Sequence, residues 1–198
     1  MLFKTSKTQL ALAVDLTLIG VIQLAALGYG LYSLTSARPL ALVFEVDRFR
    51  VVSHADIEMH DQPYLPSWAK PWGLQGVRVM GLRAPKSADE RVANFDAALQ
   101  GVEVGQRPQR WQDYRLNHME VRERAQPLHK LRAARGDQKA TIDRAVAQAL
   151  KNTQAQETQD GEALLWLPLV SRGTLDWTVL LDPITLRVRA YAPVDGFI

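Results

Sequence analysis

The chain contains no cysteine among its 198 residues. No disulfide framework can therefore stabilise the fold, and the sequence offers no redox evidence about its compartment. The absence also removes the ligand on which many structural zinc sites depend. The four histidines do not fall at metal-ligand spacings: His54, His60, His118 and His129. We expect neither a metal site nor a cofactor.

Charge of one sign is not concentrated in any segment. The 24 Lys and Arg residues are interleaved with 21 Asp and Glu residues, and the net charge is only +3. No block of five or six basic residues is present, and no paired zinc ligands suggest a base-reading motif. We therefore expect no nucleic-acid partner.

Motifs typical of catalysis are also missing. Ser171 lies in Val-Ser-Arg-Gly, which lacks the glycines of a nucleophile elbow. Gly101 and Gly105 lie in Gly-Val-Glu-Val-Gly, without the Lys-Ser/Thr of a phosphate loop or the third glycine of a dinucleotide site. These absences favour a protein that is not an enzyme and has no catalytic residues.

The alternative is a membrane-anchored envelope enzyme or regulator. It would have to use the one dense group of acids, namely Asp47, Asp56, Glu58 and Asp61. Their spacing along a predicted strand and a short turn favours a solvated edge over a catalytic cleft.

The most prominent segment that is present covers residues 10–34. It consists mostly of Leu, Ala, Val, Ile, Gly and Tyr, and its one charged side chain is Asp15. At ~1.5 Å per residue it is long enough to cross a ~30 Å hydrocarbon core. A signal peptide usually has a shorter apolar region of about 7–15 residues, and a buried globular helix is rarely apolar on every face. We predict a transmembrane helix over residues 10–34.

The orientation of this helix rests on weak charge evidence. Lys4 and Lys7 precede the apolar run, and Arg38, Arg48 and Arg50 follow it, so the positive charges nearly balance. A short N-terminus followed by a large polar region suits a single-pass protein whose C-terminal part is translocated. We expect residues 1–9 to be cytoplasmic and residues 38–198 to form one soluble domain outside.

Two polar residues interrupt the apolar run. Asp15 can lie in the headgroup region, whereas Gln23 is deeper, where a polar group is costly unless it has a partner. Ala26 and Gly30 are four residues apart and would permit close approach of a second helix. We predict a contact with a partner helix through Asp15, Gln23, Ala26 and Gly30, with the alternative that Gln23 is tolerated in lipid without a partner.

Beyond the anchor, strand-like sequence occurs near both ends of the domain. Residues 40–52 are rich in β-branched and aromatic side chains and read as one strand. Further strands are expected over residues 163–170, 177–181 and 185–191, with Asp182-Pro183-Ile184 as the turn of a C-terminal hairpin.

Helices are expected between these strands. One follows Ser87 and ends near Gly101, and another covers residues 140–150. The fold class is therefore α+β, with an antiparallel sheet made from the first strand and the C-terminal hairpin.

Residues 60–83 carry several prolines and glycines together with large aromatics, which predicts a packed, irregular loop. Trp68 and Trp72 in this loop are stiff aromatic surfaces of the kind that anchor interfaces. Core packing would explain them equally well.

Several segments resemble the type IV pilin accessory protein family, often labelled TfpX/TfpZ. Near the N-terminus they are Asp15-Leu16, the run over residues 22–31, Ala37-Arg-Pro39 and Val43-Phe-Glu-Val-Asp-Arg-Phe-Arg-Val-Val52. In the tail they are Leu165-Trp-Leu-Pro-Leu169, Thr178-Val-Leu-Leu-Asp182 and Ala192-Pro-Val-Asp195. The middle of the chain matches only loosely.

The resemblance implies a bacterial inner-membrane protein with a periplasmic domain and no cofactor. Its partners would be membrane lipid and the major type IV pilin subunit, whose stability or assembly it would assist like a chaperone. A pilin-modifying factor and a purely structural envelope subunit are the competing interpretations. Members of this family carry further membrane segments ahead of the one seen here, so we expect either a short version or a start downstream of the usual one.

Overall fold

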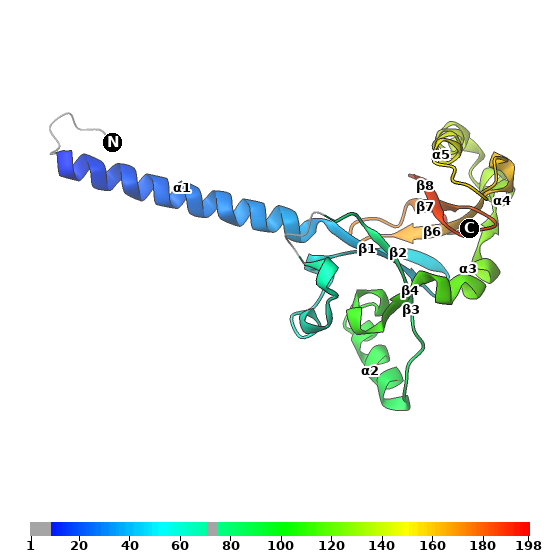
Figure 1. Cartoon of the computed structure of the whole chain (residues 1–198), viewed down its shortest axis with the longest axis horizontal. Coiled ribbons are helices and arrows are strands. Elements are labelled where there is room, and N and C mark those ends of the chain that lie inside the picture. Colours follow the sequence, from blue (N-terminus) through cyan, green and yellow to red (C-terminus); the bar gives the residue numbers. More distant parts are fainter. Residues whose placement is uncertain (1–8, 71–74) are drawn as a thin grey trace.

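The computed structural model describes residues 9–70 and 75–198. Helix α1 (Gln9–Ala37) is a straight rod that projects away from the remainder of the molecule (Figure 1). The predicted helix over residues 10–34 is confirmed and continues three residues further, to Ala37. Most of the predicted cytoplasmic segment, residues 1–9, lies outside the described residues, as does Trp72.

After α1 the chain forms a sheet with helices, so the α+β class is confirmed (Figure 1). The strands are β1 (Pro39–Glu45), β2 (Arg48–Ser53), β3 (Arg78–Leu82), β4 (Trp111–Asp113), β5 (Gln126–Pro127), β6 (Leu165–Val170), β7 (Trp177–Leu181) and β8 (Val188–Ala192). The further α-helices are α2 (Ala88–Leu99), α3 (His118–Arg124), α4 (Leu128–Ala134) and α5 (Lys139–Lys151). Short 3₁₀ turns include η1 (His54–Asp56), η3 (Ser67–Ala69) and η6 (Tyr114–Asn117).

The sheet is mixed. Its strand order is β4-β3-β1-β2-β6-β7-β8, and β5 pairs with β6. The pairs β1–β3 and β2–β6 are parallel, whereas the other pairs are antiparallel. The C-terminal hairpin of β7 and β8 is confirmed. The expected pairing of the first strand with this hairpin does not occur: β6 lies between them and pairs antiparallel with β7 but parallel with β2. The long chain between β2 and β6 makes the parallel pairing possible.

The prediction of one strand over residues 40–52 is wrong, because the chain reverses between β1 and β2. Val46 has φ 59° at this turn, a conformation that β-branched residues rarely adopt. The turn is held by packing of its flanks: Phe44 and Phe49 face each other with ring centroids 5.6 Å apart. Glu45 also accepts a hydrogen bond from Arg50 Nε at 2.7 Å.

Strand β3 lies inside the segment that was predicted to be irregular. Gly81 in this strand touches Asn117 of η6, and a Cβ at this position would lie 1.9 Å from Asn117 Oδ1. Asn117 in turn donates to the Leu82 carbonyl at 3.0 Å. The absence of a side chain at Gly81 therefore allows Asn117 of η6 to pack directly against the backbone of β3, which the sequence around Gly81 did not reveal.

Apolar side chains cover both faces of the sheet. On one face α4 and α5 pack through Leu131 and Ile142 against Trp166 and Leu180. On the other face a second cluster contains Phe44, Phe49, Tyr114, Val121, Leu181 and Leu186. A third cluster lies around Ala41, Val43 and Val52 beside the turns that follow β2. Alternate residues of β6 and β7 enter opposite clusters, as the period of a strand requires.

Candidate interaction surface

The predicted contact residues of α1 share one side of the helix. With 3.6 residues per turn, Asp15, Gln23, Ala26 and Gly30 fall within a sector of roughly 80°. Gln23, Ala26 and Gly30 are exposed. A Cβ placed on Gly30 would have no neighbour within 4 Å in the part of the chain that the structure describes. We call these four residues the α1 stripe, and its contact with a partner helix stays a prediction.

Trp68 lies in η3 and is half-buried. Its ring stacks on Trp111 with centroids 6.0 Å apart, and the Arg78 guanidinium lies 4.8 Å from its centroid. These contacts place one side of Trp68 against the third apolar cluster. Only the exposed part of the Trp68 side chain is available for the predicted interface contact, which stays a prediction.

Helix α2 presents its apolar side to solvent. Ser87 caps it by accepting a hydrogen bond from the Glu90 amide at 3.1 Å, as the sequence predicts. Val92, Phe95 and Leu99 follow at helical spacing and are 60%, 65% and 72% exposed. A surface helix normally turns such residues toward the core.

The polar side of α2 faces inward instead. Asn94 is the buried residue of this helix, and its Oδ1 accepts a hydrogen bond from Arg107 Nη1 at 2.7 Å. Exposed apolar residues in a contiguous row are typical of protein contact sites. We call Val92, Phe95 and Leu99 the α2 stripe; the sequence showed its periodicity but not its direction.

The acids that an enzyme would need serve separate local roles. Asp47 pairs with its neighbour Arg48 at 2.7 Å in the β1–β2 turn. Asp56 caps η1, where its Oδ2 accepts from the Ser53 amide at 2.8 Å and from the Ser53 hydroxyl at 2.6 Å. Both carboxylates are thus engaged by side chains close to them in the sequence.

Glu58, His60 and Asp61 bring their potential ligand atoms within 4.8 Å of one another. Asp61 is buried, and Arg107 Nε lies 3.7 Å from its Oδ2 while Gln109 Nε2 donates to its Oδ1 at 3.1 Å. The guanidinium already balances the buried carboxylate and would repel a metal cation. The arrangement is therefore better described as an ion-pair cluster than as a metal centre.

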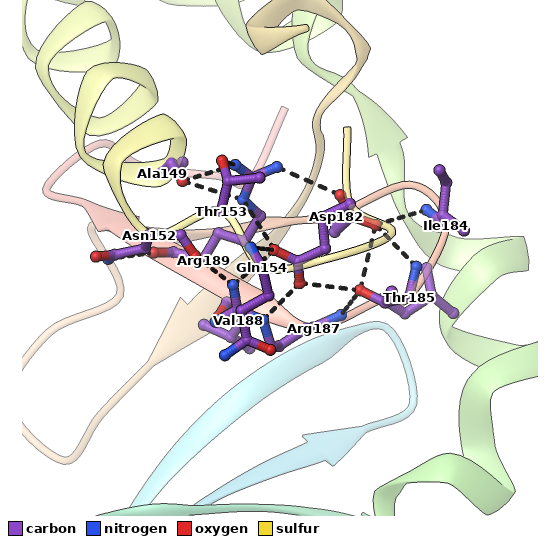
Figure 2. A network of polar contacts seen from close by, with 12 residues as sticks. Ala149, Asn152, Thr153, Gln154, Asp182, Ile184, Thr185, Arg187, Val188 and Arg189 are labelled. Atoms are coloured by element: carbon purple, nitrogen blue, oxygen red, sulfur yellow. Dashed lines mark hydrogen bonds and ion pairs between the residues drawn. The ribbon is translucent and has the colours of Figure 1, made fainter. Parts of the chain in front are cut away.

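A buried polar network joins the end of α5 to the β7–β8 hairpin (Figure 2). Arg189 donates to the Ala149 carbonyl from Nε at 3.0 Å and from Nη2 at 2.8 Å, and its Nη1 lies 3.3 Å from Asp182 Oδ2. Beside it, Arg187 donates to Glu157 from Nε at 2.5 Å and from Nη2 at 2.7 Å.

Both carboxylates of this network are held in the charged form. Hydrogen bonds from Arg187 lower the pKa of Glu157 to about 2. Burial alone would raise the pKa of Asp182, but backbone N–H groups of Thr185, Thr158 and Ile184 outweigh it and hold that pKa below its usual value. The sequence predicted only a polar linker over residues 152–161, so it missed Glu157, which meets Arg187 only in the folded chain.

Two curated proteins are similar to almost the whole chain. The fimbrial assembly proteins of serogroups E1 and I of Dichelobacter nodosus are each 31% identical to it over 185 residues, which is 93% of this chain and 68% of the relative. The chain belongs to the family of fimbrial assembly proteins. A third member of this family, from serogroups C1 and C2 of the same organism, is 46% identical over 50 residues, or 25% of this chain and 38% of the relative.

No family model matches the chain, and no solved structure matches it. The fimbrial assembly relatives therefore carry the family assignment by sequence alone. They confirm the coarse part of the resemblance, while its narrower TfpX/TfpZ-like form is not tested by them.

Proposed function

We propose that this chain is a membrane-anchored accessory protein for pilus assembly, of the TfpX/TfpZ-like type, which helps to keep type IV pilin stable before assembly. Its membership in the fimbrial assembly family supports a role in pilus assembly. That membership is the observation that carries the proposal.

In this proposal α1 spans the bacterial inner membrane once and residues 38–198 face the periplasm. The support is the length and apolar composition of α1, which are sufficient to cross a membrane. Its most apolar 18-residue window has no buried residue, and Ser36 in the last turn is the one buried residue of the described helix. Apolar side chains exposed all around a helix are stable in lipid and costly in water.

The major pilin subunit is the proposed partner. The chain would bind it through non-covalent contacts and would not modify it covalently. The α1 stripe would contact a helix of pilin inside the membrane, and the α2 stripe would contact its soluble part. The absence of catalytic motifs in the sequence and the separate local roles of Asp47 and Asp56 favour this binding role over that of a pilin-modifying enzyme.

A deletion strain tests the proposal. Without the protein, pilin should disappear from the membrane fraction and pili should be lost, and both should return when the intact chain is supplied. Pilin should also co-purify with the chain from detergent extracts. Normal amounts of pilin and normal pili in the deletion strain would refute the accessory role.

Pilin chemistry separates this role from that of an enzyme. Intact mass measurement of the remaining pilin should show the same modifications with and without the protein. Loss of one modification at unchanged pilin abundance would instead support the enzyme alternative.

A further inference from the structure

An apolar groove lies at the end of the sheet that is nearest to α1. Its volume is about 360 Å³, and it is lined by Pro39, Leu42, Val51, Val77, Leu169, Ser171, Thr174, Trp177 and Tyr191. We call it the junction groove. Two of its aromatic side chains remain partly open, because Trp177 is 37% and Tyr191 is 47% exposed.

The connection between the anchor helix α1 and this groove is very short. Arg38 is the one residue between Ala37, where α1 ends, and Pro39, which begins β1 and lines the groove. The last turn of α1 is also tied to the domain, since Ser36 is buried and Arg38 Nη2 donates to the Gln75 carbonyl at 3.1 Å. The sheet therefore starts directly where the helix stops.

The length of α1 places this junction at the bilayer surface. At ~1.5 Å per residue its 29 residues span ~43 Å. A bilayer with its headgroups is ~40–45 Å thick. A spanning α1 consequently delivers Pro39, and the mouth of the junction groove with it, to the headgroup level.

The rim of the groove has the composition of a membrane-surface contact. The loop between β6 and β7 extends toward the end of α1 (Figure 1), and it exposes Leu175, which is 57% accessible, beside Trp177. Tyr191 lies in β8, next to β7 in the sheet. Trp and Tyr are enriched at the headgroup level, where an apolar ring and a polar tip are both satisfied. Arg172 in the same loop is 76% exposed and can approach anionic headgroups.

We propose that the junction groove and its rim dock onto the phospholipid surface through which α1 emerges. The groove is occupied by phospholipid at the level where the headgroups meet the acyl chains. Leu175 and the edges of Trp177 and Tyr191 insert at this level. The domain is then held against the membrane by two contacts, α1 and the groove, which restricts its rotation about the anchor. The inference rests on the proposed anchoring by α1.

Site-specific labels can test this directly, because the chain has no cysteine of its own. Three variants of the full chain, Leu24→Cys, Leu175→Cys and Met119→Cys, would each carry one fluorophore. All three positions are exposed. Leu24 reports on α1, Leu175 on the groove rim, and Met119 on α3, whose Arg122 binds the carbonyl of Pro183 in the hairpin turn at the far end of the sheet.

The labelled proteins would be placed in nanodiscs of phosphatidylethanolamine and phosphatidylglycerol. Nitroxide quenchers would be attached to the lipid at two depths in the same nanodiscs, near the acyl-chain carbonyl for the groove rim and near the chain end for Leu24, which lies close to the middle of a spanning α1. Docking predicts loss of fluorescence for the Leu24→Cys and Leu175→Cys labels and an unchanged signal for the Met119→Cys label. The Trp177→Ser change, added to Leu175→Cys, should reduce the quenching at the rim while the quenching in α1 stays the same.

The other results are equally decisive. If the Leu24→Cys label is quenched and the Leu175→Cys label behaves like the Met119→Cys label, the docking is refuted while the anchoring stands. If the Leu24→Cys label is not quenched, the proposed anchoring itself fails. If the Leu175→Cys label is shielded from aqueous iodide but untouched by the lipid quencher, a protein covers the groove and the lipid proposal is overturned.

Discussion

Arg189 and Asp182 form an ion pair in which both side chains are fully buried, with Nη1 3.3 Å from Oδ2. The same guanidinium donates twice to the carbonyl of Ala149 near the end of α5. One side chain thus joins the last strand, the hairpin turn and the helix that covers them. A buried ion pair is stable only where hydrogen bonds satisfy both charges. Here the backbone N–H groups of Thr158, Ile184 and Thr185 donate the remaining hydrogen bonds to the Asp182 carboxylate.

Removal of Arg189 should be strongly destabilising. Arg189→Ala leaves Asp182 buried without its partner and frees the Ala149 carbonyl, so we expect the free energy of unfolding to fall by about 3–5 kcal/mol. Urea unfolding of the full chain in detergent would measure this. The matched control is Arg172→Ala, since Arg172 is 76% exposed and 3.8 Å from Asp56, and its loss should cost about 0–1 kcal/mol. Equal losses for the two variants would contradict the structural role of the network.

Acid should weaken the fold through Glu157. Its pKa is about 2 in the folded chain against an ordinary 4.5, so the ionised form stabilises the fold fully above pH 4.5 and progressively less as the pH falls toward 2. Glu157→Gln should therefore be less stable at neutral pH and lose less stability on acidification. Unfolding midpoints over a pH series would show the shallower dependence. Glu123→Gln, in α3, should retain the dependence of the unchanged protein, and a parallel loss in both variants would exclude Glu157 as the source.

Gly81 should tolerate no side chain. Gly81→Ala would place a Cβ 1.9 Å from Asn117 Oδ1, which accepts a hydrogen bond from Gln112 Nε2 at 2.7 Å. Displacing Asn117 breaks this bond, and we expect a loss of about 1–3 kcal/mol in the free energy of unfolding. Gly76→Ala, where a Cβ meets nothing within 4 Å among the residues that the structure describes, is the control and should leave the unfolding midpoint nearly unchanged.

The α1 stripe should determine association inside the membrane. Changing Gln23 and Gly30 together to leucine removes the amide and the space for close approach, so cross-linking to the membrane partner should be abolished while α1 still inserts. Leu24→Ala with Leu31→Ala alters the opposite side of the helix and should leave cross-linking intact. In-cell photo-crosslinking from α1 is the measurement, and unchanged cross-linking in the first variant would reject the contact.

The α2 stripe should affect binding more than folding. Val92→Ser with Phe95→Ser alters side chains that are 60% and 65% exposed, so stability should change by no more than about 0.5 kcal/mol per site. If pilin covers the stripe, losing a central aromatic contact should lower its recovery on co-purification about tenfold. Arg91→Ser on the same exposed helix should have no such effect, and full recovery in the double variant would remove α2 from the interface.

Elements with strong local periodicity were predictable. The sequence places Ile142, Val146 and Leu150 at fourfold spacing; helix α5 buries the first two and packs Leu150, partly buried, against the same cluster. The β7–β8 hairpin turns at Asp182-Pro183-Ile184, as expected. Ser87 capped α2 as its position suggested. In each case the signal lies within a few neighbouring residues, which is the range over which helix and turn preferences act.

Signals were weaker where distant residues decide the structure. The turn after Glu45 contains neither glycine nor proline, and Val46 takes its positive φ because Phe44 and Phe49 pack together. Glu157 lies 30 residues from Arg187, so no local pattern could pair them. The parallel pairing of β2 with β6 also depends on a crossover of more than a hundred residues.

The amino-acid sequence alone determined that residues 10–34 form a long apolar helix, because hydrogen bonding within the helix and the hydropathy of its own side chains are local properties. It also carried the kinship with fimbrial assembly proteins. Only the tertiary structure decided that α2 turns its apolar stripe outward, that Arg189 and Asp182 meet in the interior, and that an apolar groove opens beside the end of α1. Periodicity says which side chains share a face, but packing against the rest of the chain decides what that face meets.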